Sequence, residues 1–147
     1  MEILNRKAKF EYELYDKYEV GIVLTGTEIK SIRKGSCNLK DSYITIKNHE
    51  AFIINMFISK YEEGNIFNQD ETRTRKLLLH KKEILKLESK LNQDGITLIP
   101  IKLYFNNGKA KLEIAVAKGK HTYDKKEAIK QRDIKRETDK YLKRQNY

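Results

Sequence analysis

The sequence predicts a mainly β protein: a small closed antiparallel β-barrel with two embedded helices and a basic C-terminal tail that is disordered or helical. Three observations lead to this fold class. Short β-rich runs recur through the first 117 of the 147 residues, turn residues separate them, and two intervening segments have helical spacing instead. So many short strands in one domain need closure to hide their edges, which favours a barrel over an open sheet.

The first half of the chain holds several of the predicted strands. Apolar and charged residues alternate over residues 10–15, and residues 20–24 form an apolar run. Residues 42–47 and 51–58 are rich in β-forming residues, and three residues, 48–50, join them. These last two runs therefore predict a hairpin with a three-residue loop.

A second hairpin is predicted towards the end of the barrel. Its strands are expected at residues 97–105 and 111–116, and the segment between them contains Asn107 and Gly108. Asn-Gly is the strongest short hairpin signal that a sequence can carry. Pro100 lies inside the first of these strands, and proline cannot donate to a strand ladder, so we expect an edge or a β-bulge there.

Two segments have the spacing of helices. Thr25 and Glu28 match a capping box, and Gly35 stands where the helix that follows would end. A second helix is predicted at residues 81–92, after a short strand at residues 77–79; its apolar stripe consists of Ile84, Leu87 and Leu91.

The charge balance makes polyanions the first partners to consider. Thirty-one Lys and Arg against twenty-one Asp and Glu leave a formal charge of +10. No apolar run approaches the roughly 18 residues that cross a bilayer, and residues 1–10 lack the core of a secretory signal, so we expect a cytoplasmic protein. Cys37 is the single cysteine and the three histidines lack zinc-ligand spacing. Because no constellation typical of an enzyme is present, we expect no catalytic residues, cofactor or metal.

The last thirty residues differ from the rest of the chain. From Lys118 onward there are eleven Lys and Arg against five Asp and Glu, and the apolar residues are too scattered for a continuous stripe. Such a segment cannot offset the entropy of its own ordering, although its residues are good helix formers. We therefore expect an RNA-binding barrel domain at residues 1–119 and a basic tail at residues 120–147 that orders on a charged partner.

Basic residues also recur in separate clusters of the predicted barrel. Phosphates need several cationic donors and bases stack on exposed aromatic planes, so the recurrence favours RNA binding over a merely solvated surface. Arg73 and Arg75 would share one face of an extended segment, and Lys118 with Lys120 repeats the arrangement after the last strand. The basic residues expected to contact RNA are Arg6, Lys7, Arg73, Arg75, Lys76, Lys118 and Lys120.

Two carboxylates allow more than one interpretation. In a basic RNA-binding protein a carboxylate can accept from base amino groups or orient an arginine. For Glu28 the capping box is the favoured role, whereas the role of Glu19, which lies in an apolar strand context, stays open.

Several long motifs together resemble the SsrA-binding protein (small protein B) family. They occur in the order typical of that family, span nearly the whole chain, and lie at residues 5–8, 19–24, 26–33, 38–39, 41–43, 73–80, 117–120 and 124–126. The resemblance implies an OB-fold-like, oligonucleotide-binding barrel with embedded helices. That fold agrees with the strands and helices predicted above.

The resemblance also implies a function. Members of the family bind the tRNA-like part of transfer-messenger RNA (tmRNA, or SsrA RNA) and bring it to stalled ribosomes, where the nascent chain is tagged for degradation. A monomer that enters a ternary complex with the alanine-charged RNA and elongation factor Tu is expected. The positions that the family associates with RNA binding match Asn5, Glu19, Leu78, Lys111, Lys118 and Lys120.

The resemblance assigns the tail to the ribosome, where it is expected to become helical in the vacant messenger channel beside the decoding centre. The first positions assigned to the ribosome are Tyr123, Asp124, Lys125 and Lys126. On this interpretation phosphate contacts come from Lys130, Arg132, Lys135 and Arg136, and apolar anchoring comes from Ile134 and Leu142. His121 and Lys126 depart from the family, which usually has lysine and arginine at these positions.

Two other classes of protein compete with this interpretation. Another OB-type ribosomal or initiation-factor-like RNA-binding protein would share the fold and the charge but use the tail as a nonspecific anchor. A small nuclease would need an acidic cluster that converges on one site.

Overall fold

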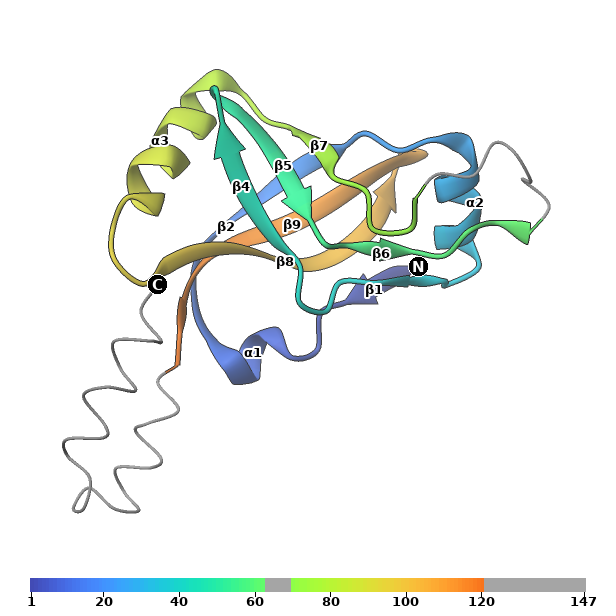
Figure 1. Ribbon diagram of the computed structural model, residues 1–147, viewed down its shortest axis with the longest axis horizontal. Coiled ribbons are helices and arrows are strands. Elements are labelled where there is room, and N and C mark those ends of the chain that lie inside the picture. The colour runs from blue at the N-terminus through green and yellow to red at the C-terminus, as the bar shows by residue number, and fades with distance from the viewer. Residues whose placement is uncertain (63–69, 121–147) are drawn as a thin grey trace, which may run out of the picture.

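The structure is a computed structural model that describes residues 1–62 and 70–120 (Figure 1). Within these ranges the chain forms three helices and nine strands. The helices are α1 (Ala8–Glu11), α2 (Gly26–Arg33) and α3 (Lys81–Leu91). The strands are β1 (Glu2–Leu4), β2 (Tyr12–Ile22), β3 (Cys37–Asn38), β4 (Tyr43–Lys47), β5 (Glu50–Ile54), β6 (Phe57–Ile58), β7 (Arg75–Leu78), β8 (Ile96–Asn106) and β9 (Lys109–Gly119).

Six of the strands form an antiparallel ring. Their order is β8-β4-β5-β7-β2-β9, and β9 pairs again with β8, which closes the ring. Strand β8 is long enough to pair on one edge with β4 at Leu98 and, further along, with β1 at Leu103. The prediction of a small antiparallel β-barrel is therefore confirmed.

The interior of the ring is apolar, because alternate residues of each strand point inward. Figure 1 shows α2 and α3 at opposite ends of the molecule. Each helix contributes a buried side chain to the core, Ile32 from α2 and Leu87 from α3. The strands contribute, among others, Val20, Ile44, Ile53, Leu77, Leu98, Leu103, Leu112 and Ile114. None of the helices in the described part of the chain is long and apolar enough to cross a membrane.

The capping box that the sequence predicts is present at α2. Glu28 N donates to Thr25 Oγ1 at 3.3 Å, and Thr25 N donates to Glu28 Oε1 at 3.0 Å. The helix ends before Gly35, whose φ of +81° is the left-handed conformation that glycine adopts at low cost. The second predicted helix is also confirmed as α3.

The turns of the two hairpins differ in how closely they match the predictions. Asn107 and Gly108 have φ values of 54° and 76°, the left-handed pair that a two-residue hairpin turn of type I′ needs. In the first hairpin Asn48 and His49 also have positive φ, and Glu50 already pairs with Lys47. The predicted three-residue loop is therefore a two-residue turn.

Two further elements differ from the sequence prediction, and one irregularity agrees with it. Helix α1 was not expected, because it has only four residues and buries only Ala8. The predicted strand at residues 51–58 ends at Ile54, because Asn55, with φ 65°, redirects the chain into β6. The register of β8 shifts between Pro100 and Lys102, so the expected β-bulge at the proline is confirmed.

Candidate nucleic-acid interface

A continuous row of residues crosses five strands on the outside of the barrel. Leu78 of β7 pairs with Gly21 of β2, Gly21 pairs with Lys111 of β9, Lys111 pairs with Tyr104 of β8, and Tyr104 pairs with Glu2 of β1. We call these five residues the outer row. Residues paired in this way lie about 4.5–5.5 Å apart, so a single ligand can touch several of them.

The alternation of the strands makes this row face outward. Val20 and Ile22 are buried in the core. Glu19 precedes Val20 and Gly21 lies between the two, so both are on the outer face of β2. On β7 the same alternation buries Leu77 and leaves Leu78 53% exposed. An exposed leucine beside a lysine is suited to contact both the base and the phosphate of a nucleotide.

Glu19 lies next to the outer row. It pairs across β2 and β9 with Glu113, and the hydroxyl of Tyr104 donates a hydrogen bond to its Oε2. The Nζ of Lys102 lies 5.3 Å from the centroid of the Tyr104 ring. Three residues that were expected to bind RNA, Glu19, Leu78 and Lys111, therefore come together from three strands.

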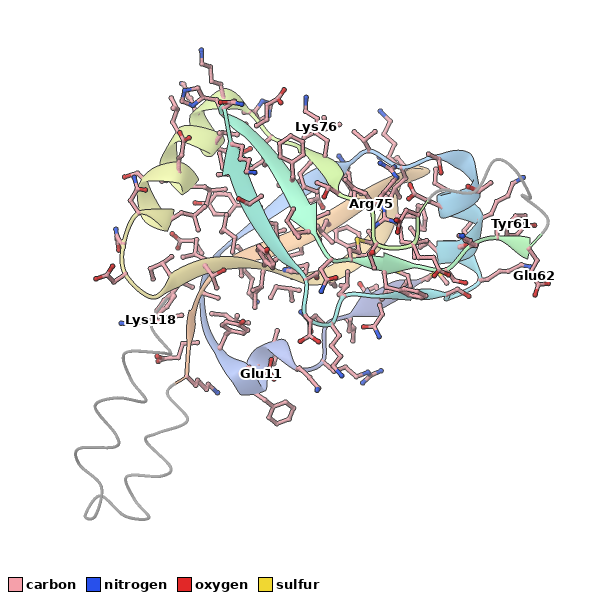
Figure 2. The ribbon with its side chains drawn as sticks, viewed as in Figure 1. Glu11, Tyr61, Glu62, Arg75, Lys76 and Lys118 are labelled. Carbon is pink, nitrogen blue, oxygen red and sulfur yellow. The ribbon has the colours of Figure 1, made fainter. Side chains whose placement is uncertain are left out.

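The remaining basic residues of the predicted site gather at the other end of β9. Lys118 is seven residues from Lys111 along this strand, which corresponds to ~23 Å. Asn5 Nδ2 donates to Pro100 O at 2.8 Å, and exposed Arg6 and Lys7 follow it. Figure 2 shows Lys118 at the lower left of the molecule and Lys76 at its upper edge.

Lys120 is tied to α1 in this second group. Its backbone N–H donates to Glu11 O at 2.8 Å, and its Nζ donates to Lys9 O at 2.8 Å. These bonds fix the point at which the chain continues into residues 121–147. Apart from Arg73, Arg75 and Lys76, the expected RNA contacts therefore form two groups. Glu19, Leu78 and Lys111 lie at the outer row, and a second group consists of Asn5, Arg6, Lys7, Lys118 and Lys120.

A cavity of about 650 Å³ lies beside the second group. Asn5 and Lys7 line it, but so do three carboxylates, Glu11, Asp41 and Asp94. Three negative charges against one positive charge do not favour a phosphate inside the cavity. We therefore place no RNA contact there.

The prediction that Arg75 contacts RNA is wrong. Its side chain is fully buried, so it is not available as an RNA contact. Figure 2 marks Arg75 among the strands. Its Nε donates to Glu28 Oε2 at 2.8 Å, its Nη1 to Met56 O at 2.6 Å, and its Nη2 to Glu71 O at 3.1 Å. Because these partners satisfy the guanidinium inside the protein, Arg75 stabilises the fold rather than binding a ligand.

Arg73 and Lys76, its neighbours in the sequence, differ in their surroundings. Arg73 is 27% exposed and donates to both carboxylate oxygens of Glu28, at 2.9 and 2.7 Å. Lys76 is exposed and pairs with Glu50 at 3.1 Å on the surface. Arg73 is therefore mainly engaged inside the protein, whereas Lys76 can exchange its surface partner for a phosphate.

Glu28 combines its predicted capping role with a buried ion pair. Burial by itself raises the pKa of this carboxyl, but the hydrogen bonds from Arg73 and Thr25 and the charge of Arg75 outweigh it and lower the pKa below its ordinary value. Glu28 therefore stays ionised, and it orients two arginines. The favoured capping role of Glu28 is confirmed, and its side chain also orients arginines, the second of the alternatives that the sequence left open.

The predicted tail contacts lie outside the described residues. These are Tyr123, Asp124, Lys125, Lys126, Lys130, Arg132, Ile134, Lys135, Arg136 and Leu142. Among the described residues no three His, Cys, Asp or Glu side chains are grouped so that they could hold a metal ion.

Sequence reasoning missed Tyr104, Gly21 and Lys102 as parts of the interface. Tyr104 does lie within a predicted strand, and strand alternation separates it from buried Leu103. The contact with Glu19 depends on the pairing of β2, β9 and β8, which no local pattern specifies. The missing signal is therefore the register between distant strands.

An outward-facing row of lysine, tyrosine and leucine on a strongly basic barrel is typical of nucleic-acid-binding β-barrel proteins. Within that class the chain belongs to the SmpB family, since the model of the SmpB protein family matches residues 2–144. The family resemblance recognised in the sequence is thereby confirmed.

Individual relatives agree with this assignment. An SsrA-binding protein of Sulfurihydrogenibium sp. is 55% identical over 139 residues, which cover 95% of this chain and 91% of that protein. An SsrA-binding protein of Acetivibrio thermocellus is 56% identical over 95% of this chain and 90% of its own length. A solved structure described as "tmRNA-SmpB: a journey to the center of the bacterial ribosome" is similar with a TM-score of 0.72 at 42% identity, covering 88% of this chain and 94% of its own.

Proposed function

We propose that this chain binds the tRNA-like part of tmRNA and delivers it to stalled ribosomes for trans-translation, so that the nascent chain is tagged for degradation. Membership of the SmpB family carries the proposal, and its relatives bear the name SsrA-binding protein. The activity is binding rather than catalysis. The site of action is the cytoplasm, where ribosomes are found.

The outer row and Glu19 form the surface that binds tmRNA. Lys111 supplies the cation for a phosphate, and Leu78 supplies an apolar surface for an unstacked base. The outward position of these residues on three adjacent strands supports this assignment. Arg6, Lys7, Asn5, Lys118 and Lys120 make the second group of RNA contacts, and Lys76 adds charge at the edge of the face.

The segment that follows Lys120 acts on the ribosome. Its excess of Lys and Arg suits a channel walled by RNA, and a messenger-free channel offers phosphates for which no message competes. Tyr123 to Lys126 are assigned to the decoding centre, and the basic residues beyond them to the vacant messenger channel. The protein enters as a monomer together with charged tmRNA and elongation factor Tu.

Competition binding tests the RNA partner. The full chain is titrated with a labelled tRNA-like fragment of tmRNA in the presence of a large excess of an elongator tRNA. We expect the fragment to stay bound, because the recognised features belong to tmRNA. Displacement of the fragment by this excess of elongator tRNA would contradict the proposal and favour a general RNA-binding protein.

A truncation after Lys120 separates the two halves of the proposal. We expect the shortened chain to bind the tmRNA fragment within about threefold of the full chain, since a change of that size is under 1 kcal/mol. Tagging on ribosomes stalled at the end of a message without a stop codon should be lost. Equal loss of binding and tagging would argue against a division of labour between barrel and tail.

A further inference from the structure

The hydrogen bond between Tyr104 and Glu19 spans the middle of the proposed RNA face. The two residues belong to β8 and β2, and β9 lies between these strands. Two strand spacings correspond to ~10 Å, so the tyrosine reaches diagonally over β9 to meet the carboxylate. Lys111 and Glu113 of β9 lie on either side of this bridge, because they pair with Gly21 and Glu19.

Glu19 needs such a bond to stay in place. Its direct cross-strand partner is Glu113, and two carboxylates that face each other repel. Lys111, two residues along the same strand, would attract a free Glu19 side chain towards the phosphate-binding position. The hydroxyl of Tyr104 holds the carboxylate between these two alternatives.

Tyr104 is itself held in position. Lys102 lies over its ring at 5.3 Å and reaches Glu2 Oε2 at 3.4 Å, so the ring is fixed from the side of β1. Partial burial and, to a smaller extent, the hydrogen bond to Glu19 raise the pKa of Tyr104 above its ordinary value. The hydroxyl therefore remains a donor across the neutral range.

We infer that Tyr104 is a positioning residue for RNA recognition: by holding Oε2 of Glu19 it aims Oε1 at an N–H donor on the edge of an unpaired base. The inference rests on the proposed function and names the chemistry of its central contact. Carboxylates accept from base amino groups, and unpaired bases expose these edges. Leu78 and Lys111 on the neighbouring strands then contact the face of the base and its phosphate.

A double-mutant cycle tests whether Tyr104 acts through Glu19. The dissociation constant of the tRNA-like fragment is measured for the wild-type chain, Tyr104→Phe, Glu19→Ala and the double variant. We expect Tyr104→Phe to weaken binding about fivefold, as the loss of one net hydrogen bond does. The double variant should bind no more weakly than Glu19→Ala, because the hydroxyl has nothing left to position. Unchanged binding by Tyr104→Phe, or independent effects in the double variant, would overturn the inference.

Two controls exclude a merely structural effect. Tyr104→Phe keeps the ring under Lys102 and leaves the net charge unchanged, so its melting temperature and the salt dependence of its binding should match the wild type. Tyr43→Phe removes the hydroxyl of another exposed tyrosine, on β4. We expect it to bind RNA like the wild type, and a loss equal to that of Tyr104→Phe would overturn the inference.

A modified RNA identifies the donor. Replacing the ribose hydroxyls of the unpaired nucleotides by 2′-O-methyl groups keeps the base edges but removes the sugar donors. If Glu19→Ala still weakens binding to this RNA, the donor is on a base, as inferred; if its effect vanishes, the donor is the ribose and the inference is wrong. A wild-type chain that binds elongator tRNA equally well would overturn the proposed function instead, and the same cycle on that RNA would still decide the role of Tyr104.

Discussion

Arg75 Nε donates to Glu28 Oε2 at 2.8 Å, and the two side chains are 0% and 4% exposed. The pair joins β7 of the barrel wall to α2 at one end of the barrel. Arg73 donates two more hydrogen bonds to the same carboxylate, and Thr25 N at the start of α2 donates another. Glu28 therefore binds two arginines and also caps its own helix. This carboxylate therefore holds α2 against the barrel.

We predict that Glu28→Ala destabilises the protein by about 3–5 kcal/mol, because it leaves the buried charge of Arg75 without a partner. Urea denaturation followed by circular dichroism measures the change. Glu50→Ala is the matched control, since its pair with Lys76 is solvent-exposed and contributes about 0–1 kcal/mol. Equal losses in the two variants would mean that the buried pair does not hold α2.

Glu28 also predicts how stability depends on acid. Burial raises the pKa of Glu28. The hydrogen bonds from Arg73 and Thr25 and the charge of Arg75 lower it by more, so the pKa in the folded state lies below the ordinary value of 4.5. A lowered folded pKa contributes stability that is present above the unfolded pKa and is lost as the pH falls through the folded pKa. We expect the urea midpoint to decline below pH 4.5, and to decline less steeply in Glu28→Gln. Parallel pH profiles of the two proteins would contradict this role.

The turn between β8 and β9 depends on a left-handed glycine. Gly108 has a φ of 76°, and a side chain there costs about 1–2 kcal/mol. We therefore expect Gly108→Ala to lower the unfolding free energy by that amount in urea titrations. Gly26→Ala is the control, because beyond its chain neighbours and its own helix no atom lies within 4 Å of an added Cβ and its φ is not left-handed, so we expect no loss of stability. A loss in both variants would point to general sensitivity of the fold to alanine.

Cys37 is expected to react slowly in the native protein. Burial raises the pKa of its thiol to about 12, although the charge of Arg75 opposes the shift. Iodoacetamide should therefore label it far more slowly at pH 8 in buffer than in urea, with mass spectrometry as the readout. Similar rates in the two conditions would show that the thiol is accessible as thiolate in the folded state.

Local signals in the sequence were sufficient for several elements. The Thr25 and Glu28 spacing located α2, and the Asn107-Gly108 pair located the turn of the second hairpin. These features depend on contacts within a few residues, so a single sequence can specify them. The predicted length of the first hairpin loop was wrong because Asn48 and His49 both adopt a positive φ, which is uncommon for residues other than glycine.

Contacts between distant strands account for most of what the sequence did not reveal. Arg73, just before β7, and Arg75, its first residue, both donate to Glu28, so they do point to one side as expected, but that side faces α2 rather than the solvent. Burial of Arg75 is tolerated because Glu28, Met56 O and Glu71 O accept its hydrogen bonds. The partner of Tyr104 likewise depends on the register of three strands. The family resemblance identified Glu19, Leu78 and Lys111. That Gly21 and Tyr104 lie beside them is evident only from the strand pairing.

The salt dependence of binding by a Lys111→Ala variant tests the central claim most directly. Lys47 of β4, a strand that β8 separates from β9 in the ring, provides the charge-matched control Lys47→Ala. With the tRNA-like fragment of tmRNA, we predict that Lys111→Ala weakens binding and reduces the slope of log K against log salt by about 1, while Lys47→Ala changes neither. Identical slopes and affinities for wild type and Lys111→Ala would contradict the assignment of the outer row to RNA.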